Sequence, residues 1–167
     1  NAMVWIRGQR EDYDAWAAAG NAGWGFDDLL PAFRAVECAE AGTDEWRGRE
    51  GPVHVRAMDR FVHPLTRRYL EAARQAGLPL NPDFNGATQE GVGIYQITAK
   101  GGRRMSAARA FLRPAMRRRN LCVVTGALAT RILFDGGRAA GVEYRRGGGS
   151  LAAKARAAVI LSAGAIG

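Results

Sequence analysis

The chain has 167 residues, enough for about one domain with a hydrophobic core, so neither disulfides nor a metal ion is needed to hold the fold. Its net charge of +8 admits a nucleic-acid partner, but the arginines are scattered, and bulk charge speaks to solubility more than to function. No apolar run approaches the ~18 residues that a membrane span needs, and no signal peptide is visible, so we expect a cytoplasmic protein without a membrane span.

The first third of the sequence predicts two helices and a loop. Residues 11–19 have acidic side chains at their start and a glycine directly after them, which is typical of a short helix. Residues 27–40 predict a second helix, with Asp27 as its N-terminal cap and one apolar face. The polar, glycine-containing stretch 41–52 predicts a loop.

The middle of the sequence predicts a short strand and a third helix. In "GPVHVRA", residues 51–57, apolar and polar side chains alternate as they do in a half-buried strand. A helix then begins at Pro64 and ends before Gly77, since proline is favoured in a first helical turn and glycine after a last one. Leu65 and Tyr69 lie on the apolar face of this helix.

The stretch "GVGIYQITAKGGRRMSAARAFL" joins a predicted strand to a predicted helix. Residues 92–98 alternate as a strand, and Ser106 caps a helix that carries Phe111 inward and ends near Pro114. A phosphate-binding turn would need G-x-x-x-x-G-K-[ST] or G-x-G-x-x-G, and both patterns are absent. We therefore interpret the glycines as a turn into a capped helix.

The last third changes to strand patterns. Four apolar, β-branched runs occupy residues 120–126, 129–134, 139–146 and 157–164, with glycine-rich breaks between the last three. This spacing predicts an antiparallel meander followed by a buried strand. Together with the helices before it, the meander gives an α+β fold class.

The chemically reactive side chains form no self-contained catalytic set. Cys38 and Cys122 are far apart with no C-x-x-C motif, so we expect buried free thiols in a reducing compartment. His54 and His63 are too few and too widely spaced for a metal site. No serine lies in a nucleophile elbow, so serine hydrolysis has no support.

Long segments of the chain resemble the glucose-methanol-choline (GMC) oxidoreductase family, its choline and alcohol dehydrogenase branch in particular. The first segment is "NAMVWIRGQREDYDAWAAAGNAGWGFDDLLPAFRAVE". It is followed in the family's order by "GPVHV", "DFNGATQEGVGIYQITAKGGRRMSAARAFLRPA", "NLCVVTGALATRILFDGGRAAGVEY" and "VILSAGAIG". The resemblance covers essentially the whole chain.

The resemblance implies an FAD-dependent oxidoreductase of two domains that acts on the CH–OH group of choline or another primary alcohol and passes a hydride to the flavin. It assigns residues 1–50 to the FAD-binding domain, 51–100 to the substrate domain, and 101–167 to the return into the FAD-binding domain. "GGRRMSAARAFL" would then be a joint between domains. The small-molecule alcohol is the expected partner, and nucleic acid is not.

The resemblance also implies which residues meet the cofactor. Small residues suit backbone contact because no side chain blocks close approach. "NAMV" would run past the isoalloxazine, "TGALATRI" would pair its backbone with the adenine, and "SAGA" would form the turn beneath the flavin. The expected FAD-binding residues are Asn1, Ala2, Val4, Ala129, Ala163 and Gly164. Ala2 would also face the substrate, and no catalytic or metal-binding residue is expected.

Two parts that the resemblance implies are absent from these 167 residues: the G-x-G-x-x-G strand and turn that hold the ADP moiety, and a catalytic histidine. We therefore expect an internal fragment that neither retains FAD nor turns over alone. Two rival hypotheses stay open. One is a small basic domain that binds nucleic acid; the other is a folded remnant that forms homo-oligomers through the apolar faces of residues 27–40 and of the meander.

Overall fold

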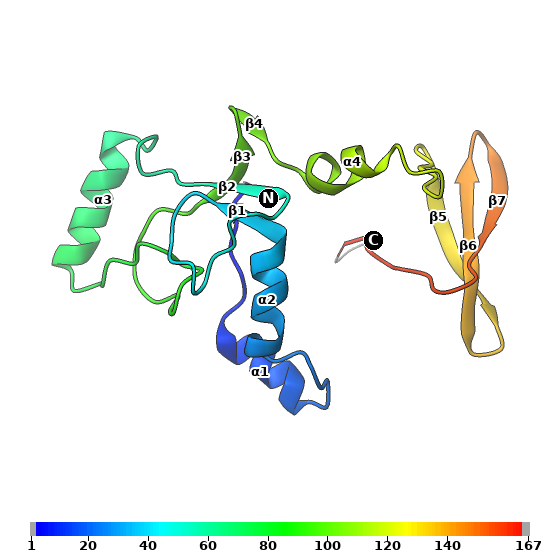
Figure 1. Ribbon diagram of the computed structural model, residues 1–167, viewed down its shortest axis with the longest axis horizontal. Helices are drawn as coiled ribbons and strands as arrows, with labels where there is room; N and C mark the ends of the chain where they lie inside the picture. The colour runs from blue at the N-terminus through cyan, green and yellow to red at the C-terminus, as the bar shows by residue number, and fades with distance from the viewer. Residues whose placement is uncertain (1–2, 165–167) are drawn as a thin grey trace. The chain divides into compact units, whose positions relative to one another are not determined.

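The computed structural model describes residues 3–164 (Figure 1). The chain forms two compact units, Asn1–Arg117 and Arg118–Gly167. The helices of the first unit are α1 (Arg10–Ala18), α2 (Phe26–Val36), α3 (Pro64–Gln75), the π-helical turn η1 (Ala108–Leu112) and α4 (Arg113–Ala115). Its strands are β1 (Glu37–Ala39), β2 (Val53–Arg56), β3 (Ile97–Lys100) and β4 (Arg103–Arg104). The second unit contains β5 (Leu128–Asp135), β6 (Arg138–Arg146) and β7 (Gly149–Lys154). These elements confirm the predicted α+β class.

Helix α1 confirms the first predicted helix, and α2 confirms the second only in part. The predicted cap is wrong: Gly25 occupies the N-cap position of α2, and its N–H is bonded by Asp28 at 3.2 Å. Asp27 instead pairs with Arg10 at 2.7 Å. The helix also ends four residues early, because Glu37 is extended and begins β1.

The first unit is built on a four-stranded sheet in the order β1-β2-β3-β4. β1 runs parallel to β2, and β2–β3 and β3–β4 are antiparallel. The alternation predicted for residues 51–57 is confirmed, since Val53 and Val55 are buried while His54 and Arg56 are partly exposed. The small core consists of Ala39, Val53, Val55 and Ala110, with Trp5 and Met105 packed against it.

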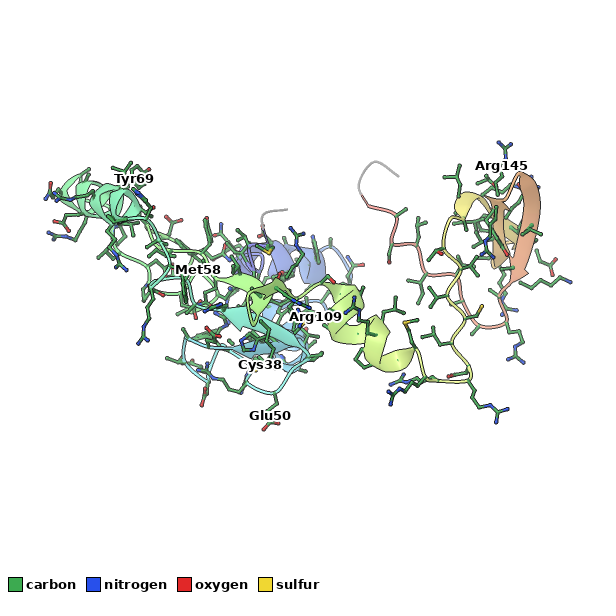
Figure 2. All side chains as sticks on the ribbon, turned by 90° about the horizontal axis from the view of Figure 1, so that it is seen from above. Cys38, Glu50, Met58, Tyr69, Arg109 and Arg145 are labelled. Atoms are coloured by element: carbon green, nitrogen blue, oxygen red, sulfur yellow. The ribbon has the colours of Figure 1, made fainter. Side chains whose placement is uncertain are left out.

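Helix α3 confirms the predicted bounds but not the predicted burial. His63 precedes it, and the Nδ1 atom of His63 accepts a hydrogen bond from the Leu65 N–H at 3.1 Å. Leu65 and Tyr69 are each 69% exposed, although their spacing is that of a buried face. Figure 2 labels Tyr69 on this helix. The amphipathic pattern is therefore real, but no described element of the unit covers it.

The stretch 91–112 is less regular than predicted. Of the strand predicted over residues 92–98, only Ile97 and Thr98 belong to β3, because Val92 pairs within its own loop: Val92 N–H bonds Pro79 O, and Asn81 N–H bonds Val92 O, both at 2.8 Å. After β3, Gly101 and Gly102 turn the chain into β4 with φ of +57° and +69°, values that favour glycine. The prediction that Phe111 points inward is wrong, since the buried residue of η1 is Ala110.

Ser106 lies at the predicted helix start, where its Oγ accepts a hydrogen bond from the Arg109 N–H at 3.3 Å. The helix continues past Pro114, which lies in the first turn of α4. Proline is tolerated there because its missing N–H is not needed in a first turn.

The second unit is a three-stranded antiparallel sheet in the order β5-β6-β7, which confirms the meander. Two predicted strands are wrong: residues 120–126 and 157–164 form none. The strand β7 begins within the glycine run that was predicted to be only a break, because Gly147 and Gly148 alone make the turn with positive φ. Cys122 is exposed and Cys38 partly buried, so the prediction of two buried thiols is also wrong.

Within residues 3–164, no helix is both long enough and apolar enough to cross a membrane. In the same part of the chain, no three His, Cys, Asp or Glu side chains gather as a metal site would require. His54 is instead bonded to Glu40, 2.8 Å away.

Candidate functional site

The six residues predicted to bind FAD lie in different parts of the chain. Asn1 and Ala2 lie outside the described residues. Val4 belongs to the first unit, where it forms an antiparallel bridge with Ile97, and its side chain is 40% exposed. The segment that holds Val4 therefore pairs with β3 through a single bridge.

Ala129, Ala163 and Gly164 belong to the second unit, so the structure does not bring the predicted set together within one unit. Ala129 lies in β5, opposite Tyr144 of β6. Since β5 is an edge strand of its sheet, one side of it presents backbone groups that the sheet leaves unpaired. Ala163 and Gly164 are exposed and follow the last strand, and Gly164 has φ of +95° with open space where a Cβ would lie.

The segment Met3–Arg7 is fastened to β3 by backbone hydrogen bonds. Trp5 N–H donates to Gln96 O at 2.9 Å, and Thr98 donates to Met3 O through its N–H at 2.8 Å and its Oγ1 at 3.3 Å. Met3 has φ of +65°, the left-handed region that a non-glycine residue enters at a cost on the order of 1–3 kcal/mol. Such strain persists only where surrounding contacts hold it, and it is concentrated at functional sites.

A pocket of about 390 Å³ opens beside this segment. Its lining is mostly apolar, with Thr98, Arg104 and Ser106 as the polar contributors. The other lining residues are Met3, Val4, Trp5, Val36, Val53, Met105, Ala107 and Phe111. An apolar pocket with a few polar groups is the usual form of a cofactor or small-molecule site.

The carboxylate of Glu37 contacts the segment Met3–Arg7 and is fully buried. It accepts hydrogen bonds from Trp5 Nε1 at 2.7 Å and from Arg7 Nη2 at 2.5 Å. Arg47 binds it through Nε at 3.0 Å and Nη2 at 3.1 Å, and the Gly48 N–H adds a bond of 3.0 Å. One carboxylate thus joins the N-terminal segment to the loop between β1 and β2.

A second group of side chains, Asn85 and Gln89, also binds the segment Met3–Arg7. Asn85 accepts from Arg7 N–H at 2.7 Å and donates to Trp5 O at 2.9 Å, while Gln89 donates to Arg7 O at 2.7 Å. Asn85 is itself oriented by Asp83, whose Oδ1 accepts from the Asn85 N–H at 3.0 Å. Asp83 also pairs with Arg47 at 2.7 Å, so the two groups are connected.

The environment shifts the pKa values of these groups. Burial alone would raise the pKa of Glu37, but the hydrogen bonds from Arg47 and Gly48 and the charges of Arg7 and Arg47 outweigh it, so its pKa is lowered. Burial lowers the pKa of Arg7. Burial acts in the same direction on Arg47, but hydrogen bonds to Glu37 and Asp83 outweigh it, so the pKa of Arg47 is raised. The carboxylate is therefore ionised and compensated.

This network was not predicted from the sequence. Arg7 and Arg47 counted only among the scattered arginines of the sequence, yet their side chains are 4% and 0% exposed. Glu37 was placed inside a helix, where its carboxylate would have had no reason to be buried. The one available signal was the "NPDFNG" run, but its Asp83 and Asn85 are residue types typical of any turn.

Comparison with known proteins decides the family. Residues 1–167 match the profile described as GMC oxidoreductase. The chain belongs to the GMC oxidoreductase family. The oxygen-dependent choline dehydrogenase of Rhizobium etli is 45% identical over 163 residues, which cover 98% of this chain and 29% of that protein. The mitochondrial choline dehydrogenase of Homo sapiens is 46% identical over 166 residues, covering 99% of this chain and 28% of the relative.

Solved structures agree with this membership. Pyridoxine 4-oxidase from Mesorbium loti superposes with a TM-score of 0.85 and 35% identity, covering 92% of this chain and 31% of that one. An FAD-dependent oxidoreductase from Chaetomium thermophilum gives a TM-score of 0.83 and 29% identity, covering 93% and 29% of the two chains. This GMC chain thus spans less than a third of the proteins it matches.

Proposed function

We propose that this chain supplies the flavin-facing part of an FAD-dependent oxidoreductase that acts on the CH–OH group of choline or another primary alcohol. The observation that carries the proposal is the strained Met3, held by Thr98 beside a mostly apolar pocket in a chain of the GMC family. The choline substrate rests on the names of the relatives from Rhizobium etli and Homo sapiens.

The residues present fit a flavin. The segment Met3–Val4 has its carbonyl direction fixed and an exposed apolar side chain, and it borders a pocket with room for part of a flat ring. Asn1, Ala2 and Val4 would hold the isoalloxazine, and the edge strand with Ala129 would hold the adenine. Ala163 and Gly164 would lie beneath the ring, where the absent Cβ of Gly164 leaves room for close approach. When bound, FAD accepts a hydride from the alcohol carbon.

The role of this chain in that reaction is to bind and to orient. Its mostly apolar pocket lining would contact the ring, and its hydrogen bonds fix the backbone that the cofactor would meet. Neither histidine lines this pocket: His54 is bonded to Glu40, and His63 precedes α3. We accordingly assign no catalytic residue to residues 1–167.

We further propose that a polypeptide of residues 1–167 alone does not retain FAD, since these residues contain no G-x-G-x-x-G turn. The assignment of residues 1–50 and 101–167 to an FAD-binding domain, and of 51–100 to a substrate domain, stays part of this proposal. The four-stranded sheet takes strands from all three ranges.

A chimera tests the proposed function. The aligned stretch of the Rhizobium etli choline dehydrogenase is replaced by residues 1–167, and the purified protein is assayed for bound FAD and for oxidation of choline and other primary alcohols. We expect one FAD per chain and alcohol-dependent turnover. A folded chimera without flavin, or with flavin that no alcohol reduces, contradicts the proposal.

A further inference from the structure

Glu37 connects two side chains of the proposed flavin-facing segment, Trp5 and Arg7, to the loop after β1. Its two oxygens accept hydrogen bonds from the Trp5 indole, the Arg7 guanidinium, the Arg47 guanidinium and the Gly48 amide. Two of these donors belong to the N-terminal segment and two to the loop after β1. The position of the segment relative to that loop therefore depends on this carboxylate.

The position of the segment depends on the negative charge of Glu37 in particular. Arg7 and Arg47 face two carboxylates, Glu37 and Asp83, so the buried group is neutral as a whole. Asp83 bonds Arg47, and among the described residues Glu37 is the only carboxylate that bonds Arg7. Without the charge of Glu37, the buried Arg7 is left uncompensated, and a charge in that state moves toward water or draws water in.

Movement of Arg7 cannot stay local. Its backbone N–H and C=O are bonded by Asn85 and Gln89, and Trp5, two residues earlier, is held by Glu37 and by Asn85. Met3 keeps a left-handed conformation that only such fixed neighbours maintain. A shift at Arg7 thus reaches the backbone of Met3 and Val4.

We infer that Glu37 is a positioning residue of the flavin-facing segment: its buried carboxylate, compensated by Arg7 and Arg47, sets where Met3 and Val4 lie against the cofactor. This inference rests on the proposed function for its consequence at the flavin. It does not rest on that function for the structural coupling itself, so the two are tested separately.

The coupling is tested in the 167-residue chain by hydrogen exchange with mass-spectrometric readout. The variants are Glu37→Gln, which keeps the shape and removes the charge, and Glu50→Gln as a control at an exposed glutamate. We expect Glu37→Gln to accelerate exchange about tenfold or more in residues 3–8, because charge-assisted hydrogen bonds are lost, and to accelerate it less in α2 and β2. Unaltered exchange in residues 3–8, or equal acceleration in α2 and β2, overturns the inference.

The consequence at the flavin is tested in the chimera with the Rhizobium etli enzyme. Here Glu37→Gln is expected to retain FAD but to shift its visible spectrum and reduction potential, and to lower kcat about 100-fold with a smaller change in KM, as misplacement of reacting groups does. Glu50→Gln should leave all four unchanged. An unshifted spectrum with full kcat in Glu37→Gln overturns the inference. An unsubstituted chimera without flavin refutes the proposed function instead, and the exchange experiment still decides the coupling.

Discussion

The carboxylate of Glu37 and the guanidinium of Arg47 meet through two hydrogen bonds of 3.0 and 3.1 Å, and neither side chain is exposed. A bidentate pair of this kind gives geometric specificity as well as energy. The two residues are ten positions apart in sequence: Glu37 begins β1 directly after α2, and Arg47 lies in the loop that follows β1. The pair therefore fixes the direction in which the chain leaves α2.

Substituting Arg47 should destabilise the first unit strongly. Arg47→Met leaves Glu37 and Asp83 with one buried cation between them, and breaking a buried ion pair from one side costs about 3–5 kcal/mol. Urea titration followed by tryptophan fluorescence measures this directly, because Trp5, Trp16, Trp24 and Trp46 all lie in the first unit. Arg68→Met, at an exposed position of α3, is the matched control and should change stability by less than about 0.5 kcal/mol.

Acid should weaken the first unit through Glu37. Because the folded-state pKa of Glu37 is lowered, the unfolded chain binds more protons between the two pKa values. The stabilisation is therefore complete above the ordinary glutamate pKa of about 4.3 and is lost as pH falls through the lower folded value. The midpoint urea concentration is measured by tryptophan fluorescence at a series of pH values from neutral downward. In the native chain it should decrease once the pH is below about 4. A Glu37→Gln chain should show a shallower fall, and equally steep curves would exclude Glu37 as the source.

Asn85, an uncharged residue, should contribute to the stability of the first unit. Asn85→Ala removes the bond to the Arg7 N–H and the bond to Trp5 O and leaves both backbone groups without that partner. The expected loss is about 1–3 kcal/mol in the free energy of unfolding. Gln75→Ala on exposed α3 provides the comparison. Equal stability of the two variants would show that Asn85 does not hold the segment.

The meander should depend on one glycine for steric reasons. A Cβ at Gly141 of β6 would lie 2.5 Å from Ala153 O of β7, closer than any real Cβ contact. Gly141→Ala should therefore separate β6 from β7 and accelerate hydrogen exchange in residues 149–154. Gly137→Ala has open space around its Cβ and should leave that exchange unchanged. The opposite order of effects would contradict the register of this sheet.

Local patterns were sufficient for the elements that depend on local signals. The bounds of α3 followed from Pro64 and Gly77, β2 followed from alternation, and the β5–β6 pair followed from alternation and its glycine turn. The family followed from the long ordered segments, beginning with residues 1–37. These features are encoded over a few neighbouring residues, or over whole segments, and so could be predicted.

Features set by distant contacts could not be predicted in the same way. Glu37 leaves the helix because its carboxylate is bound by Arg7, 30 residues earlier, and by Arg47. Residue Val92 leaves the predicted strand because it pairs with Pro79 and Asn81. No pattern within either stretch shows these partners. Residue type alone also does not distinguish an arginine that is buried in the fold from one on the surface.

Photoaffinity labelling tests the central claim most directly, namely that the segment held by Glu37 faces the flavin. The chimera with the Rhizobium etli enzyme is loaded with FAD that bears an azide on its isoalloxazine ring, irradiated, digested and analysed by mass spectrometry. We predict that the label is found on the peptide containing residues 1–7. Efficient labelling of other peptides with none on residues 1–7 would contradict the claim.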